Sequence, residues 1–282
     1  MEKTMKNIFW LCAGLTVMCI LFIGGFILIK GIPFFSHTNL IEFLFGQHWM
    51  PSGEIFGIYP MLVASFYATL GSITVGIIIG ISTAIVITQI LPTRLADMCS
   101  KTIDLLAGIP SIIYGFFGLM VIVPILEKHF GGKGGGLSLL AVIIILSFMI
   151  LPTIIRMTEV SLRAVPNEFK EGAYALGATR LQYIFKVQLK AAKSGILAGI
   201  ILAIGRALGE TMAVMLVAGN TPLIPSSIID PVRTITANIA MEMAYAAGVH
   251  QQALFATGLI LFVIIISINI CMQLLIKKLE RR

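Results

Sequence analysis

Two opposite charges stand four residues apart inside a long apolar run, in the stretch "AIGRALGETMAV" at residues 203–214. They are Arg206 and Glu210. An arginine at the centre of a bilayer costs about 2.5–3.5 kcal/mol on insertion scales. Because apolar residues would fill a structural position without that cost, the charges favour a role in a pathway across a membrane. The alternative is a structural ion pair, since side chains at i and i+4 of a helix face each other.

The glycines around these charges predict which side of the helix they occupy. On a wheel of about 100° per residue, the glycines and the two charges fall within an arc of about 140°. Two G-x-x-x-G pairs contribute to this arc, and such pairs permit close approach of helices. The charged residues are therefore predicted to face neighbouring helices and not lipid. The residues of the arc are Gly195, Gly199, Gly205, Arg206, Gly209 and Glu210.

Other polar residues near the apolar runs are weaker candidates for a pathway. For each of them a structural role is favoured over contact with cargo, because such side chains often satisfy backbone groups freed at prolines. They are Thr211, Asn220, Ser111 and Tyr114, the last two beside Pro110. Pro152 is predicted to end or kink the helix that contains it.

The composition of the chain indicates a membrane protein. The chain has 282 residues, of which 58% are hydrophobic and 12% are charged, with a mean hydropathy of +1.00. Ordinary soluble domains are about 45–50% apolar and about 25% charged. The net charge of +7 is attributed to loops on the cytoplasmic side of a bilayer, with lipid and not nucleic acid as the partner. The four cysteines have no disulfide or zinc spacing, so no metal is expected.

Apolar segments long enough to cross a bilayer predict an all-α membrane protein with six transmembrane helices, the first of them a retained anchor. Fifteen of the 20 Lys and Arg residues lie in segments 1–7, 92–103, 156–194 and 277–282, and only four lie in the alternate loops. This bias predicts that both termini are cytoplasmic. The expected spans are residues 8–29, 59–91, 104–126, 137–155, 195–218 and 252–276.

The long loop at residues 163–195 predicts two short amphipathic helices joined at Gly177. Pro166 suits the first turn of the first helix, and Gly177 suits its end. Thr179 and Gln182 form a capping-box pattern that begins the second helix. Two functions are open on pattern alone, a helix pair at the membrane surface or a docking element for a protein. The apolar positions of the two helices are Phe169, Ala173, Leu176, Tyr183, Ile184, Val187 and Ala191.

The segment "EGAYALGATRLQ" resembles the signature cytoplasmic loop of ABC importer permeases. Glu171, Gly172, Ala173 and Gly177 match its pattern, with Gly172 in place of the first of two usual alanines. Three further segments resemble permeases of the phosphate-specific ABC importer, PstC-like rather than PstA-like. These are "LLAGIPSIIYGFFGL" (105–119), "SLRAVPNEF" (161–169) and "GRALGETMAVMLVAGN" (205–220). The similarity covers most of residues 58–276.

The resemblance implies a type I ABC importer permease fold. It implies an N-terminal anchor helix and external loop (1–58), a permease core (59–276) with its coupling loop at about 163–193, and a basic tail (277–282). It places the chain in the inner membrane of a prokaryote, with a PstA-like second permease, PstB-like ATPase subunits and an external PstS-like phosphate-binding protein. The residues that it assigns to ATPase coupling are Glu171, Gly172, Ala173, Leu176 and Gly177.

No P-loop pattern occurs in the chain, so it is expected to be a transport subunit and not an enzyme. ATP and Mg are then expected on the partner ATPase, with no cofactor bound by this chain. The resemblance also associates Arg206 and Glu210 with phosphate translocation. A guanidinium binds phosphate oxygens bidentately, which lysine cannot do, and Glu210 would compete for the arginine so that cargo is released. The alternatives are a permease for another oxyanion or polar solute, or an ion-coupled secondary carrier.

Overall fold

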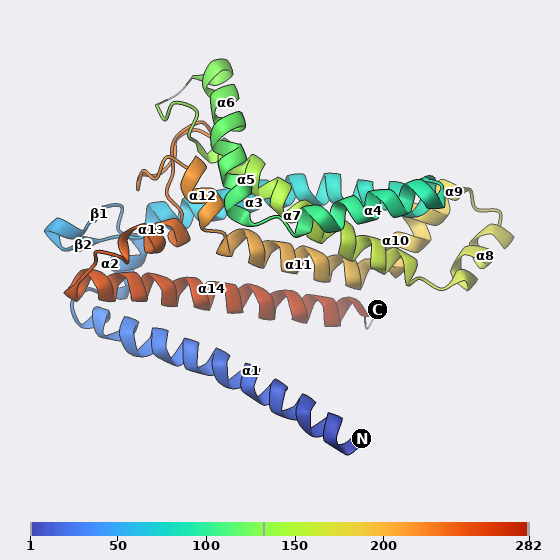
Figure 1. Cartoon of the computed structure of the whole chain (residues 1–282), viewed down its shortest axis with the longest axis horizontal. Coiled ribbons are helices and arrows are strands. Elements are labelled where there is room, and N and C mark those ends of the chain that lie inside the picture. Colours follow the sequence, from blue (N-terminus) through green and yellow to red (C-terminus); the bar gives the residue numbers. More distant parts are fainter. Residues whose placement is uncertain (1, 132, 281–282) are drawn as a thin grey trace.

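Two long apolar helices form the centre of the molecule, α3 (Tyr59–Ile85) and α7 (Leu139–Arg163). A Cβ atom on Gly71 would lie 2.6 Å from Ile143 of α7, and one on Gly80 would lie 2.7 Å from Ile154. Lipid supplies no hydrophobic drive between helices, so such close packing is what holds them together. This computed structural model describes residues 2–131 and 133–280, and Figure 1 shows the arrangement of their helices.

Helix α11 (Lys193–Gly209) crosses α7 through two glycines. A Cβ on Gly199 would lie 2.5 Å from Met157, and one on Gly195 would overlap Ser161. The first predicted G-x-x-x-G pair is therefore confirmed as a packing motif. Helix α4 (Thr93–Ala107) packs on α7 through Ala96, Ser100 and Ile103.

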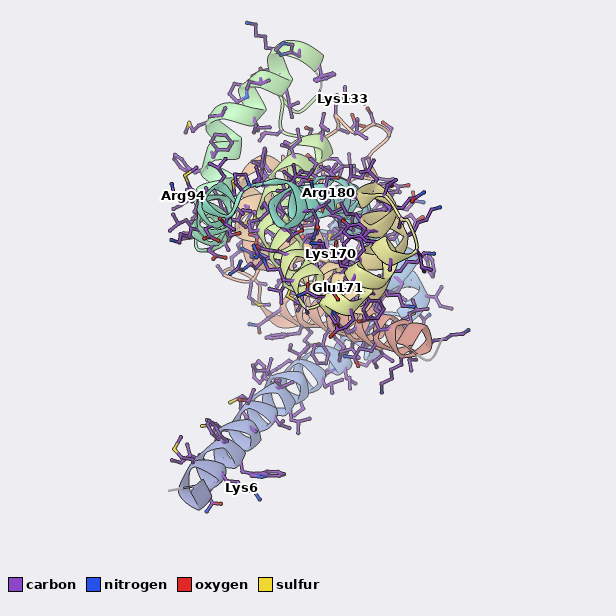
Figure 2. The ribbon with its side chains drawn as sticks, turned by 90° about the vertical axis from the view of Figure 1, so that its right-hand side faces the viewer. Lys6, Arg94, Lys133, Lys170, Glu171 and Arg180 are labelled. Carbon is purple, nitrogen blue, oxygen red and sulfur yellow. The ribbon has the colours of Figure 1, made fainter. Side chains whose placement is uncertain are left out.

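Helices α1 (Glu2–Gly31) and α14 (Gly248–Glu280) pair with each other at one end only. Gly31 brings α1 against the backbone of Phe255 and Ala256, and the rings of Phe26 and Phe255 meet edge to face at 5.7 Å. Toward its N-terminus α1 leaves the bundle, so that Lys6 lies far from the other labelled residues (Figure 2).

A small apolar core closes the end of the bundle that carries the strands in Figure 1. Strands β1 (Trp49–Met50) and β2 (Ile55–Phe56) pair antiparallel, with Trp49 opposite Phe56. Phe34 and Phe43 are fully buried beneath them. The other elements of this end are a 3-10 helix (Ile32–Ser36), α2 (Leu40–Phe45), a 3-10 turn (Pro51–Gly53) and α13 (Ile235–Glu242).

Helices α5 (Ser111–Phe117) and α6 (Val123–Phe130) are joined by a π-helical turn (Gly118–Ile122) and rise away from α3 and α7 in Figure 1. The opposite end of the bundle from the strands carries the start of α1, the end of α14 and the segment from α8 to α10. The remaining helical pieces are a π turn at Val86–Ile90, α8 (Asn167–Ala175), α9 (Arg180–Gln182), a π turn at Tyr183–Gln188, α10 (Leu189–Ala191) and α12 (Met212–Val217).

The six apolar segments expected from the sequence all appear as helices, five of them long enough to cross a membrane. The other segment, expected at 195–218, begins in Lys193–Gly209, which is bent by 67° from the preceding Arg180–Ala191. Among the five long helices, two boundaries were wrong. The third span begins at Ser111 and not at 104, because residues 104–107 end α4. The fourth continues through the buried Pro152 to Arg163, because Ile154 and Leu162 beyond it pack into the core.

Candidate functional site

The fifth apolar segment is interrupted where the two charges lie. Helix α11 ends at Gly209, Glu210 is extended (φ −68°, ψ 130°), and α12 begins at Met212. The expectation of one continuous helix over 195–218 is therefore wrong. Ala213 N donates to the Glu210 carboxylate at 3.1 Å, and Thr236 Oγ1 donates to the Glu210 carbonyl at 2.7 Å. These bonds satisfy polar groups at the break, which is how irregular backbone is tolerated at membrane depth.

Arg206 lies one turn before the break and is partly buried. The wheel placed it beside Glu210, but the chain turns between them and the Glu210 side chain caps α12 instead. Within the described residues, the Arg206 guanidinium forms no ion pair and no hydrogen bond. The structural i, i+4 ion pair is therefore not formed. The charged group interacts electrostatically with the Tyr114 hydroxyl, which lies on α5.

A second interruption lies next to the first, between α4 and α5. Pro110 starts α5, with Ser111 as its first residue, and the Tyr114 hydroxyl donates to the Leu106 carbonyl of α4 at 2.8 Å. A Cβ on Gly115 would lie 2.7 Å from the Cα of Ala213, so α5 crosses α12 here. The fold thus brings the start of α5 to the break that follows Arg206.

Two further predicted residues have structural contacts. Thr211 Oγ1 donates to the Gly209 carbonyl at 3.2 Å, inside the break. Asn220 lies beyond the far end of α12, where its Nδ2 donates to the Met215 carbonyl at 2.8 Å. Its backbone is left-handed (φ 52°), and its carbonyl accepts from Arg233 Nε at 2.8 Å. Asn220 therefore closes α12 and stands apart from Arg206.

The interior beside Glu210 holds almost no empty space. A cavity of about 10 Å³ lies between α3, α11, α12 and the start of α13, which is at the lower limit for one water molecule. By contrast, a Cβ on Gly205 or Gly209 would meet no atom within 4 Å. The second G-x-x-x-G pair therefore packs against nothing in the described chain, and α11 leaves this side open next to Arg206. The polar lining of the cavity is Ser65, Thr69, Glu210, Thr234 and Thr236.

The predicted helix pair is confirmed at the end of the bundle that faces the viewer in Figure 2. Gly177 ends α8 in a left-handed conformation (φ 79°). The capping box is complete, with Thr179 N to Gln182 Oε1 at 2.8 Å and Gln182 N to Thr179 Oγ1 at 3.3 Å. Ala173 packs against Tyr183 and Ile184.

The apolar stripe expected on α8 does not form one buried face. Ala173 is buried, but Phe169 is half exposed and the Leu176 side chain is 91% exposed. The expected apolar side chains do not share one face, because α8 ends at Ala175 and Leu176 therefore points away from the packed face. Glu171 and Gly172 are exposed as well, and Figure 2 shows Lys170, Glu171 and Arg180 at this surface. Its exposed apolar side chains are Phe169, Tyr174, Leu176, Leu181 and Phe185.

Sequence reasoning missed a buried carboxylate, Glu159, on the last turns of α7. Glu159 accepts from Arg156 and Arg163 at 3.0 Å each and from Ser100 of α4 at 3.0 Å. Arg156 also pairs with Asp104 of α4 at 3.4 Å. The spacing Arg-x-x-Glu-x-x-x-Arg is a signal for such pairs on a helix, but these residues were assigned to a loop.

A second buried carboxylate, Glu242, lies at the strand end of the bundle and was also missed. Its oxygens accept from Trp49 Nε1 and Arg233 at 2.8 Å each and lie 2.8 Å from His250 Nε2.

In the segment between α12 and α13, a hydrogen bond from the Ser226 hydroxyl holds the pKa of Asp230 below its usual value, and backbone N–H groups of Ser226 and Ser227 act in the same direction. These bonds order the segment between α12 and α13.

A family model described as binding-protein-dependent transport system inner membrane component matches residues 76–282. The probable ABC transporter permease protein YqgH of Bacillus subtilis is 38% identical over 258 residues, 89% of this chain and 83% of the relative. The phosphate transport system permease protein PstC of Mesorhizobium japonicum is 36% identical over 260 residues, 86% of this chain and 80% of the relative.

Solved structures share the fold. An inward-facing form of the MetNI methionine ABC transporter matches with a TM-score of 0.60 at 20% identity, over 77% of this chain and 93% of that chain. An amino acid ABC transporter crystallised with histidines matches with a TM-score of 0.53 at 16% identity, over 78% and 92%. The chain thus has a type I ABC importer permease fold.

Proposed function

We propose, because this chain belongs to the family of binding-protein-dependent transport system inner membrane components, that it is the PstC-like permease of an ATP-driven importer of inorganic phosphate. It is a multi-pass inner-membrane transport subunit. The observation that carries the phosphate assignment is Arg206, a guanidinium without an ion pair or hydrogen bond in the described chain. It lies one turn before a helix break and next to Gly205, where α11 is uncovered. Relatives named as phosphate transport permeases support the same assignment.

Arg206 would contact phosphate transiently. Its planar donors match two phosphate oxygens at once, and no carboxylate among the described residues occupies them. Glu210 would moderate this contact without a direct ion pair, because its charge stays one turn away while its carboxylate caps α12. A site that is moderately attractive allows cargo both to enter and to leave.

The pathway itself would run along the open side of α11 and not through the interior of this chain. The cavity beside Glu210 is far smaller than a polyatomic anion. Gly205 and Gly209 leave the face of α11 uncovered, and a PstA-like second permease would pack there and form the other half of the pathway. Ser111, Tyr114 and Thr211 would line it near Arg206, whereas Asn220 would only support its outer end.

The surface at α8 would dock into a cleft of a PstB-like ATPase that carries ATP and Mg. Exposed apolar side chains on a rigid two-helix unit suit such a groove. Gly172, Ala173 and Gly177 shape this unit, while Glu171 and Leu176 are exposed to the partner. Closure of the ATPases would then move α7 and α11, to which the unit is joined. This end would face the cytoplasm, with both termini on the same side.

The test uses the complete complex reconstituted in lipid with an external phosphate-binding protein. ATP hydrolysis should rise with phosphate and not with sulfate or molybdate. Stimulation by another oxyanion in place of phosphate would reassign the cargo. Uptake driven by an ion gradient without ATP, and unaffected by changes at Glu171 or Gly177, would identify a secondary carrier instead.

A further inference from the structure

Helix α13 is fixed at both of its ends to parts of the chain that lie far apart in sequence. It has eight residues, Ile235–Glu242, and is therefore about 12 Å long. Its first turn reaches the helix break after Arg206. Its last residue reaches the external hairpin formed by residues 46–57. Hydrogen bonds of 2.7 Å and 2.8 Å join its ends to these two parts of the chain.

The first turn of α13 holds the break through Thr236. Its hydroxyl donates to the Glu210 carbonyl at 2.7 Å, and this carbonyl belongs to the extended residue that separates α11 from α12. The same turn is positioned on α3, where Ile235 N donates to Ser65 Oγ at 3.0 Å. A carbonyl freed by a helix break has no water to pair with inside a membrane. The Thr236 hydroxyl therefore helps to fix the position of Glu210.

The last residue of α13 holds the hairpin through Glu242, which is 6% exposed. One carboxylate oxygen accepts from Trp49 Nε1 at 2.8 Å, and the other accepts from Arg233 at 2.8 Å. Trp49 in turn packs edge to face on Phe56, its partner across the two strands, at 5.4 Å. Hydrogen bonds to a buried charge are short and strong, so the hairpin and the end of α13 form one unit.

We propose that α13 is a strut through which the external hairpin sets the position of the helix break beside Arg206, with Thr236 as the positioning residue. A displacement of the hairpin reaches Glu242 through Trp49, and the short helix carries it to Thr236 and the Glu210 carbonyl. A protein that docks on the hairpin from outside thus acts on Arg206 without touching it. This inference rests on the proposed function only for its consequence in transport, and not for the mechanical link.

Hydrogen exchange in the complete reconstituted complex, without phosphate, tests the link directly. Thr236→Val should speed amide exchange in residues 207–214 about fivefold, the equivalent of one lost hydrogen bond, and Thr236→Ser should restore it. Trp49→Phe should also speed exchange in 207–214, although Trp49 lies at the other end of α13. Matched controls are Trp10→Phe and Thr16→Val on α1, which should leave 207–214 unchanged.

A change in Trp49→Phe confined to residues 46–57 and 233–250, with 207–214 as in the parent, would overturn the strut. Measurement of phosphate uptake tests the proposed function separately from the exchange data. With rates normalised to assembled complex, Thr236→Val should lower the maximal rate of phosphate uptake several-fold and leave the KM unchanged, while Thr236→Ser stays near the parent. If the parent transports no phosphate, the proposed function fails while the exchange data still decide the strut.

Discussion

The Arg206 guanidinium and the Glu210 carboxylate stand four residues apart and form no ion pair, because α11 ends between them at Gly209. Glu210 turns to cap α12 through Ala213 N at 3.1 Å, and Arg206 has no ion pair within the described residues. An ion pair between Arg206 and Glu210 would have occupied N–H donors of the guanidinium. In the proposed function, their separation would leave the arginine available to an anion, and the charge of Glu210 would limit how tightly the anion is held.

Replacing Arg206 with lysine should lower phosphate uptake about tenfold or more while the complex still assembles. Lysine keeps the charge but loses the bidentate geometry, and hydrogen bonds to charged groups contribute about 1.5–3 kcal/mol. Uptake of labelled phosphate by reconstituted complex measures this. The control is Arg94→Lys, an exposed arginine on α4 (Figure 2), which should transport normally. Unchanged uptake in Arg206→Lys would remove Arg206 from the pathway.

Substitutions can separate the hydrogen bond that Glu210 accepts from Ala213 N from the proposed role of its charge in release. Glu210→Gln keeps an oxygen to accept from Ala213 N and removes the charge, so the protein should remain stable while phosphate is released more slowly and maximal uptake falls. Glu210→Ala also removes the cap and should destabilise by about 0.5–2 kcal/mol. Thermal unfolding in detergent and uptake together measure the two effects. If Glu210→Gln transports at the parental rate, the charge plays no part in release.

The features that the sequence predicted well are those encoded by neighbouring residues. Gly177 and the Thr179–Gln182 capping box define the two helices of the loop, and the structure contains both. The break at Glu210 was missed because hydropathy stays high from 195 to 218, and only Gly209 marks it locally. Thr236 contacts Glu210 across 26 residues, and no periodicity in the sequence predicts a contact between such distant residues. The domain division at residues 58 and 276 remains a prediction.

Leu176 should be needed for association with the ATPase. Its side chain is 91% exposed and supports nothing within the described chain, so Leu176→Ala should fold normally but weaken co-purification of the ATPase and lower phosphate-stimulated ATP hydrolysis several-fold. Leu223→Ala removes an exposed leucine at the other end of the molecule and is the matched control. Equal loss in both variants, or loss in neither, would argue against docking at α8.

Glu159 should stabilise the attachment of α4 to α7. It is 2% exposed and accepts from two arginines and from Ser100. Glu159→Ala should lower the free energy of unfolding by about 1.5–3 kcal/mol, the value of hydrogen bonds to charged groups. Thermal unfolding of the purified complex measures it, with the exposed Glu168→Ala as control. Equal melting temperatures for the two variants would mean that the cluster contributes little.

Substitution by alanine should destabilise the chain at one glycine of α11 and not at another. A Cβ on Gly199 would lie 2.5 Å from Met157, so Gly199→Ala should force α7 and α11 apart and destabilise this chain by about 1–3 kcal/mol. Gly205 faces open space, so Gly205→Ala should leave the isolated chain as stable as the parent.

The larger Gly205→Leu then tests what covers the open side of α11. If a second permease packs there, this variant should be stable alone but fail to hold the second permease during purification, because a G-x-x-x-G face tolerates no bulky side chain. Thermal unfolding of the single chain and co-purification of the pair distinguish the two effects. Normal assembly of Gly205→Leu would place the second permease, and with it the pathway, on another face of the molecule.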